Sequence, residues 1–190
     1  MSDHALCEIA VTAIEIALVE HVRRRPPLGG LDPTLTEPGA SFVTLERDGQ
    51  LLGCIGALQP RQPLAWDVAE HALGAAFDDP RLPALTDDDF PEMSVKVSVL
   101  SPSVRVPAAS FAELRDVIEP GIDGLTVEAG PHRATLLPSV WPKVRDRDEF
   151  LSMLWSKAGL RPGVWPHRII VTRYRTDEEH DPGPRPAPRR

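Results

Sequence analysis

The dipeptide Asp48-Gly49 constrains the fold of this chain more than any other short stretch. An Asp-Gly pair between two strand-like runs is typical of a two-residue β-hairpin turn, because such turns need positive φ angles. Residues 42–47 before it alternate weakly between apolar and polar side chains, and residues 50–56 after it return as a partner strand. The sequence therefore predicts a β-hairpin over residues 42–56.

The second predicted strand contains the stretch that most resembles a functional site, Leu51-Leu52-Gly53-Cys54-Ile55-Gly56. Glycine destabilises a strand unless the backbone must bend there or another group must approach closely. Side-chain alternation predicts that Leu52 and Cys54 share one face of the strand and that Ile55 lies on the other. We expect Cys54 to be the candidate catalytic residue, with substrate- or partner-binding candidates at Gly53, Ile55 and Gly56.

Further motifs follow in a fixed order: Pro63-Leu64, Asp79-Pro80-Arg81 and Ser98-Val99-Leu100-Ser101-Pro102. Together with the Gly-Cys-Ile-Gly stretch, they resemble the AMMECR domain family, known in prokaryotes as AmmeMemoRadiSam system protein A. The resemblance extends over nearly the whole chain through Gly121-Ile122-Asp123-Gly124-Leu125, Leu137-Pro138-Ser139-Val140-Trp141 and Lys157-Ala158-Gly159-Leu160.

The resemblance implies an α+β fold with a larger domain and a small subdomain. It also implies that the protein works as one component of a multi-protein enzyme system, with a Memo-like protein and a radical SAM enzyme as partners. Two positions depart from the family pattern: Leu52 stands where the family has Arg, and Trp155 stands where a second Cys is common. Because apolar surroundings raise the pKa of a thiol, Leu52 argues against autonomous catalysis by Cys54.

Other periodic segments give the remaining elements. Helices are predicted over 2–24, with Ser2 or Asp3 as N-cap, from Pro63 onward, over 111–118 and over 148–158. Strands are predicted over 94–100 and 167–174, and a second hairpin is predicted around residues 129–132. This order predicts an α+β fold with a mainly antiparallel sheet and packed helices.

Length and composition limit the organisation and the partners. The chain has 190 residues, enough for one structural unit over 1–176 with room for a small subdomain. Residues 177–190 are charged and rich in proline, so we expect a disordered tail there. A net charge of −7 disfavours a nucleic-acid partner. No run of about 18 apolar residues suits a membrane, and the N-terminus lacks a basic signal start, so we expect a cytoplasmic protein.

Two further residues are candidates for substrate or partner binding. Arg81 is suited to hold a carboxylate or phosphate through two parallel hydrogen bonds, and a structural pairing with Asp79 explains it equally well. Trp141 lies between two prolines and either walls a pocket or fills the core.

Three more residues carry ionisable or nucleophilic side chains of interest: Asp67, His71 and Cys7. Asp67 and His71 are four apart on a predicted helix, so they either share a solvated face, ligate a metal, or form a base with its orienting carboxylate. Cys7 lies in the first predicted helix and is expected to pack. Two cysteines cannot form a structural zinc site, and we predict no metal site.

Three functional hypotheses remain open. In the first, the chain is a component that binds a small molecule or a partner protein at Gly53-Cys54-Ile55-Gly56. In the second, it is a stand-alone enzyme with Cys54 as the nucleophile on a small anionic substrate. In the third, the strand is merely packed closely and its glycines serve a β-bulge. The sequence contains no Ser-His-Asp order, phosphate loop or dinucleotide fingerprint, and it specifies no cofactor.

Overall fold

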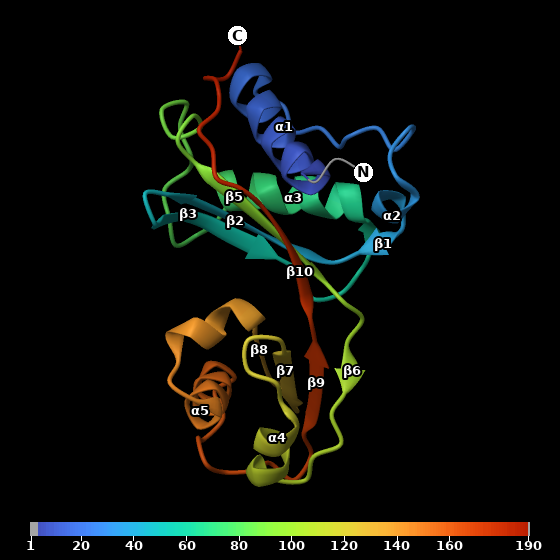
Figure 1. The fold of residues 1–190 in the computed structure, drawn as a ribbon, viewed down its shortest axis with the longest axis vertical. Coiled ribbons are helices and arrows are strands. Elements are labelled where there is room, and N and C mark those ends of the chain that lie inside the picture. The colour runs from blue at the N-terminus through green and yellow to red at the C-terminus, as the bar shows by residue number, and fades with distance from the viewer. Residues whose placement is uncertain (1–3, 190) are drawn as a thin grey trace. The chain divides into compact units, whose positions relative to one another are not determined.

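The computed structural model describes residues 4–189, so the expected N-cap at Ser2 or Asp3 lies outside the described residues. The chain forms two compact units. The first extends to Leu100 and resumes at Asp177, and the second comprises Ser101–Thr176 (Figure 1). The composition predicted one unit with room for a small subdomain and gave no signal for the boundary at Leu100.

The first unit is a sheet with helices on one face. Strands β2 (Ser41–Arg47), β3 (Gln50–Gly56), β5 (Ser94–Leu100) and β10 (Thr176–Asp181) form a sheet in the order β10-β5-β2-β3. Helices α1 (Ala5–Glu20) and α3 (Leu64–Phe77) lie on the same side of this sheet (Figure 1). The predicted helices and strands are present, although α1 ends before the arginines at 23–25.

Smaller elements join the hairpin to α3. Helix α2 spans Pro33–Thr36, and Asp32 caps it by accepting a hydrogen bond from the backbone N–H of Thr34. Strands β1 (Pro38–Gly39) and β4 (Gln62–Pro63) pair antiparallel. Their pairing brings the start of β2 next to the start of α3.

The predicted hairpin is confirmed, with one irregularity. Leu45 pairs with Gly53 and Glu46 pairs with Leu51, so Leu52 is an extra residue in a β-bulge. Leu52 consequently packs against the core, on the same side as Ile55. The prediction that Leu52 shares a face with Cys54 is therefore wrong, because a bulge interrupts the alternation on which it depended.

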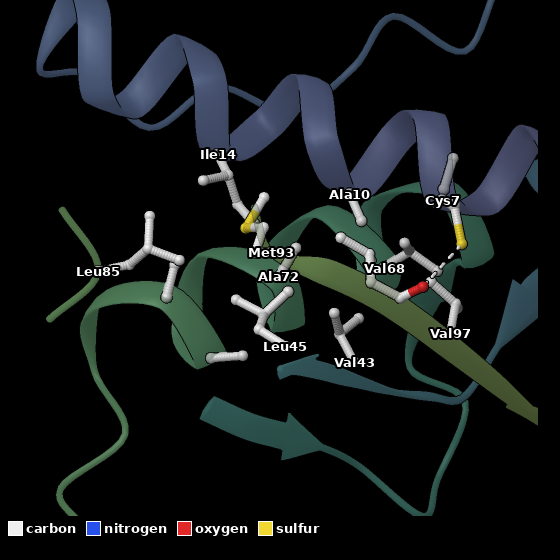
Figure 2. Close-up of a cluster of buried hydrophobic side chains, with 14 of the residues drawn as sticks. Cys7, Ala10, Ile14, Val43, Leu45, Val68, Ala72, Leu85, Met93 and Val97 are labelled. Carbon is white, nitrogen blue, oxygen red and sulfur yellow. Dashed lines mark hydrogen bonds between the residues drawn. The ribbon is translucent and has the colours of Figure 1, made fainter. Parts of the chain in front are cut away.

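The core of the first unit lies between the sheet and the two helices. Figure 2 shows Val43 and Leu45 of β2 directed toward this core, together with Cys7 of α1. Cys7 is 1% exposed, and its Sγ donates to the carbonyl oxygen of Val95 at 3.5 Å. Burial, together with the nearby Glu179 carboxylate, raises the pKa of the Cys7 thiol to about 12. Cys7 is thus a packing residue, as expected.

The C-terminal segment is not the disordered tail that its composition predicted. Strand β10 begins at Thr176 and forms an edge of the first sheet beside β5. Its carboxylates accept hydrogen bonds from Ser98 and from the backbone N–H of Cys7, at 3.1 and 2.7 Å. Farther along, the backbone N–H of Arg185 donates to Pro91. A strand on a sheet edge is held by backbone pairing, so this segment needs no apolar side chains.

The second unit contains the other four-stranded sheet. Its strands β6 (Val104–Arg105), β7 (Gly124–Ala129), β8 (His132–Leu136) and β9 (Ile170–Tyr174) follow the order β6-β9-β7-β8, with antiparallel pairing. Its helices are α4 (Phe111–Val117), the 3₁₀-helix η1 (Pro138–Lys143) and α5 (Arg147–Lys157). The sheets and helices of both units confirm the predicted α+β class.

Aromatic side chains fill much of the second core. Trp155 is fully buried, contacts Phe111 and Trp165, and donates to the carbonyl oxygen of Val164 at 3.1 Å. A bulky indole therefore fills the core at the position where the resemblance led us to look for a second cysteine.

Candidate functional site

The backbone of Cys54 is held by the pair Asp79 and Arg81. Asp79 accepts a hydrogen bond from the N–H of Cys54 at 3.0 Å, and the Arg81 guanidinium donates to the Cys54 carbonyl oxygen at 3.0 Å. Strand β3 is an edge of its sheet, so these groups would otherwise have no partner in a neighbouring strand. At Cys54, Asp79 and Arg81 thus supply the two hydrogen bonds that a neighbouring strand would otherwise supply.

The two clamping side chains also bind each other tightly. Arg81 donates to both carboxylate oxygens of Asp79, at 2.8 and 2.6 Å, and its backbone N–H donates to the same group. The Asp79 side chain is 2% exposed, and the Arg81 side chain is 61% exposed. Hydrogen bonds from the guanidinium hold the pKa of Asp79 well below its usual range, and the pKa of Arg81 is raised in return.

The two glycines of the motif have steric roles. A Cβ at Gly53 would overlap the carbonyl oxygen of Ala75 in α3, so glycine lets the strand and the helix backbone touch. A Cβ at Gly56 would overlap the Phe42 ring. Close packing therefore explains both glycines without a ligand, whereas the third hypothesis assigned them to a β-bulge, whose extra residue is Leu52.

The thiol of Cys54 lies on the sheet face opposite the helices. Cys54 pairs with Thr44, which stands between the two buried core residues Val43 and Leu45 and so faces the other way. The Thr44 hydroxyl donates to Cys54 Sγ at 3.3 Å. Next in the same row is Lys96 on β5. It is two strands from Cys54, about 10 Å at ordinary strand spacing, and its Nζ lies 3.9 Å from Glu178.

Trp141 belongs to the second unit and is one of its core residues. It is 7% exposed, stacks on Phe150 with ring centroids 3.9 Å apart, and donates from Nε1 to the Asp123 carbonyl oxygen at 2.8 Å. The structure thus brings Arg81 to Cys54, and it places Trp141 among the core residues of the second unit.

A second buried carboxylate lies inside α3. One oxygen of Asp67 accepts from the backbone N–H and the hydroxyl of Ser41, at 2.8 and 2.7 Å. The same oxygen lies 3.1 Å from Nδ1 of His71. All three residues are buried, with Ser41 fully so. The geometry therefore agrees with a carboxylate that orients an imidazole, and the pair does not share a solvated face.

His71 also lines a pocket of about 530 Å³. The opposite wall comes from the chain segment after α1, and the lining residues include Arg23, Arg24, Arg25, Ile55, Glu70 and Asp78. Ile55 is therefore directed toward this pocket, whereas Cys54 is on the other face of the strand. The Gly-Cys-Ile-Gly stretch thus contributes to two separate surfaces.

Sequence reasoning missed Ser41 and Thr44. Ser41 lies 26 residues from Asp67, and no local pattern links them. The hairpin register alone would have placed Thr44 opposite Gly53, and only the bulge at Leu52 moves it opposite Cys54. The predicted hairpin therefore placed Thr44 beside the motif, but one residue away from Cys54.

Residues 4–189 contain neither a cluster of metal ligands nor a membrane-spanning helix. No group of three or more His, Cys, Asp or Glu side chains in this range is arranged to hold a metal ion. The helices in this range are also too short or too polar to traverse a lipid bilayer.

The family model named AMMECR1 matches residues 7–178, which includes most of both units. This chain belongs to the AMMECR1 family. An AMMECR1-like fold was implied by the motifs around Cys54 and Arg81, and the family assignment is now confirmed.

Archaeal relatives in the AMMECR1 family match most of this chain. A protein of Methanothermobacter thermautotrophicus is 36% identical over 187 residues, which cover 94% of this chain and 93% of the relative. A protein of Thermofilum pendens is 38% identical over 177 residues, covering 85% and 81%. The crystal structure of the uncharacterized protein PH0010 from Pyrococcus horikoshii is similar, with a TM-score of 0.85, 34% identity, and coverage of 94% of this chain and 91% of that one.

Proposed function

We propose that this AMMECR1-family protein is a binding component of an AmmeMemoRadiSam-type multi-protein enzyme system. Its role is to hold a small molecule or a partner protein at the sheet face that carries Cys54. The observation that supports this most is the clamp on Cys54: Asp79 and Arg81 fix the backbone of an edge strand while the thiol stays partly exposed. A fixed, partly exposed side chain is suited to recognition.

The surroundings of the thiol favour a component over a stand-alone enzyme. A catalytic cysteine needs a base or an unpaired cation beside it. Within residues 4–189, Cys54 Sγ accepts a hydrogen bond from the Thr44 hydroxyl, which is no base at neutral pH. The charge of Arg81 is balanced by Asp79, and Lys96 is two strands away.

Protection of Cys54 from alkylation tests the proposal. The full chain is treated with iodoacetamide, alone and with a Memo-like protein and a radical SAM enzyme encoded nearby, and mass spectrometry locates the label. We expect the partners to slow labelling of Cys54 by about tenfold or more, because a bound surface is covered. Albumin at the same concentration is the control. An unchanged rate, together with failure of the three proteins to co-purify, would contradict the proposal.

The pH dependence of the same reaction tests the enzyme alternative. Labelling of Cys54 with a midpoint far below the ordinary thiol value of about 8.5 would indicate a stabilised thiolate and favour catalysis by Cys54. Buried Cys7, whose pKa is raised to about 12, serves as the internal control because it should stay unlabelled until the protein unfolds.

A further inference from the structure

The pocket of about 530 Å³ beside α3 combines a held histidine with a basic segment. His71 is one of its lining residues, and the His71 side chain is 11% exposed. Its Nδ1 faces Asp67 and Ser41, while its Nε2 has no hydrogen-bond partner among residues 4–189. A histidine fixed on one side and unpartnered on the other is ready to bind something in the pocket.

The network behind His71 determines which ring nitrogen is available. The Ser41 N–H and hydroxyl both donate to Asp67, so this carboxylate is an acceptor and requires a hydrogen on His71 Nδ1. In the neutral ring, Nε2 is then the lone-pair nitrogen. His71 therefore presents a proton acceptor to the pocket in a fixed orientation.

The facing wall supplies guanidinium groups. Arg23 is already paired with Asp78, since its two terminal nitrogens donate to the Asp78 carboxylate at 2.5 and 2.8 Å. Arg24 contacts Glu20 at 2.7 Å. Arg25 is held more loosely, because its distance to the Glu70 carboxylate is 3.5 Å.

The loosely paired Arg25 is nevertheless fixed in place. Its guanidinium lies over the Trp66 ring, 4.9 Å from the centroid. Trp66 in turn donates from Nε1 to the carbonyl oxygen of Pro26, at 3.0 Å, which ties the basic segment to α3. The Trp66 ring already restricts the Arg25 side chain. Arg25 can therefore replace its weak contact with Glu70 by a stronger acceptor without losing further side-chain freedom.

The rest of the lining is apolar. Ile55, Ala69 and Leu73 contribute carbon surface, and Gly74 leaves room beside Ile55. The volume is in the range of pockets that bind small organic molecules. A ligand for this site needs an apolar body as well as an anionic group.

We propose that this pocket binds a small phosphate monoester with an apolar organic group. Near neutral pH a phosphate monoester carries a charge of about −1.5 to −2, because its second pKa is about 6, and its singly protonated form stays accessible. The proton can be shared with His71 Nε2 while Arg25 holds the remaining oxygens. A carboxylate brings no such proton, so it would bind less well. The site uses the face opposite Cys54 and is independent of the function proposed above.

Calorimetry on the full chain with phenyl phosphate is the direct test. We expect saturable binding, and weaker binding by about tenfold for benzoate, which keeps the ring but brings no proton. Inorganic phosphate, which lacks the apolar body, should also bind more weakly. Absence of saturable phenyl phosphate binding, or equal affinity for benzoate, would overturn the proposal.

Matched variants separate the parts of the site. His71→Asn retains a donor near the Nδ1 position for Asp67 but removes Nε2, and it should weaken phenyl phosphate binding by about tenfold. Arg25→Gln should weaken it by a similar factor. Glu70→Gln should strengthen it by about threefold, because it releases Arg25.

Arg61→Gln is the control for charge, since Arg61 is exposed in the same unit and is not a lining residue. It should bind phenyl phosphate as the unaltered chain does. Circular dichroism on each variant verifies that the fold is retained. Equal weakening by Arg61→Gln and Arg25→Gln, or no change in His71→Asn, would show that the binding is not at this pocket.

Discussion

Two buried carboxylates, Asp67 and Asp79, attach α3 and the turn after it to the same hairpin. Asp67 holds the start of β2 through Ser41, and Asp79 holds the middle of β3 through Cys54. Each accepts at least two hydrogen bonds, as a buried carboxylate requires, and each lies against a basic side chain: Arg81 donates to Asp79, and His71 Nδ1 lies 3.1 Å from Asp67. The two carboxylates differ in the further contacts that their basic partners make.

Arg81 donates to the Asp79 carboxylate and to the Cys54 carbonyl, so its network closes on the backbone. His71 uses only one ring nitrogen on Asp67 and has the other directed to a pocket. The same kind of buried carboxylate is thus structural at one end of α3 and poised for a ligand at the other. The surroundings of the basic partner separate the two cases, because the Arg81 side chain is 61% exposed whereas His71 lines a pocket.

Gly53→Ala should have the largest effect, because it strikes the contact between β3 and α3. The added Cβ would overlap the Ala75 carbonyl oxygen, and a backbone atom cannot rotate away. We expect the free energy of unfolding to fall by about 4 kcal/mol, the upper range for steric strain in a core. Urea unfolding followed by circular dichroism measures it.

The same variant also separates the two networks. Displacing β3 should break the Asp79 bond to Cys54 and spare the Asp67 bond to Ser41, which is on β2. The imidazole NMR signals of His71 should therefore stay unchanged. Gly29→Ala is the control, since a Cβ there meets nothing within 4 Å. Equal losses of stability in the two variants would contradict the steric role of Gly53.

Asp79→Ala should rank next, with a loss of about 3 kcal/mol, because Cys54 N–H and Arg81 lose a charged acceptor. The loss should depend on pH. The pKa of Asp79 in the folded protein is below the ordinary Asp value of 3.8, so its stabilisation is complete above that pH and disappears as pH falls below it.

Urea unfolding at pH 7 and at pH 3 tests this dependence. The difference between the unaltered chain and Asp79→Ala should shrink at the lower pH, while the difference for Gly53→Ala, which is steric, should not follow the same trend. A constant Asp79→Ala difference would mean that the carboxylate charge is not what stabilises the clamp.

Local sequence patterns predicted one pair of side chains in each network and none of the contacts that these pairs make elsewhere in the fold. Asp79 and Arg81 are two residues apart, and Asp67 and His71 are one helical turn apart, so each pair followed from the sequence. What each carboxylate reaches across the fold did not follow. Cys54 and Ser41 contact them through tertiary packing, for which the sequence offered no periodic signal.

Two other predictions failed for physical reasons. The alternation rule for β3 assumed an unbroken ladder, and the bulge at Leu52 turned that side chain to the core. Composition predicted disorder after residue 176, yet β10 is held by backbone pairing and by polar contacts of its carboxylates. Composition measures the capacity to bury apolar area, and an edge strand depends little on it.

Ser41→Ala tests the Asp67 network. It removes one of the donors to the carboxylate and retains the backbone N–H of residue 41, so we expect a loss of about 2 kcal/mol, the usual range for a hydrogen bond to a charged group. The His71 ring should also become less well fixed, which NMR line widths of the imidazole would report. Sharp, unshifted signals would indicate that Ser41 does not position His71.

Arg81→Ala should have the smallest effect, about 1 kcal/mol, because its side chain is 61% exposed and water can replace it. Asp79 would still accept from the backbone N–H groups of Cys54 and residue 81. A loss as large as that of Asp79→Ala would mean that the guanidinium, and not the carboxylate, holds β3. The ratio of the two losses, measured by urea unfolding at pH 7, therefore decides which half of the clamp carries the strand.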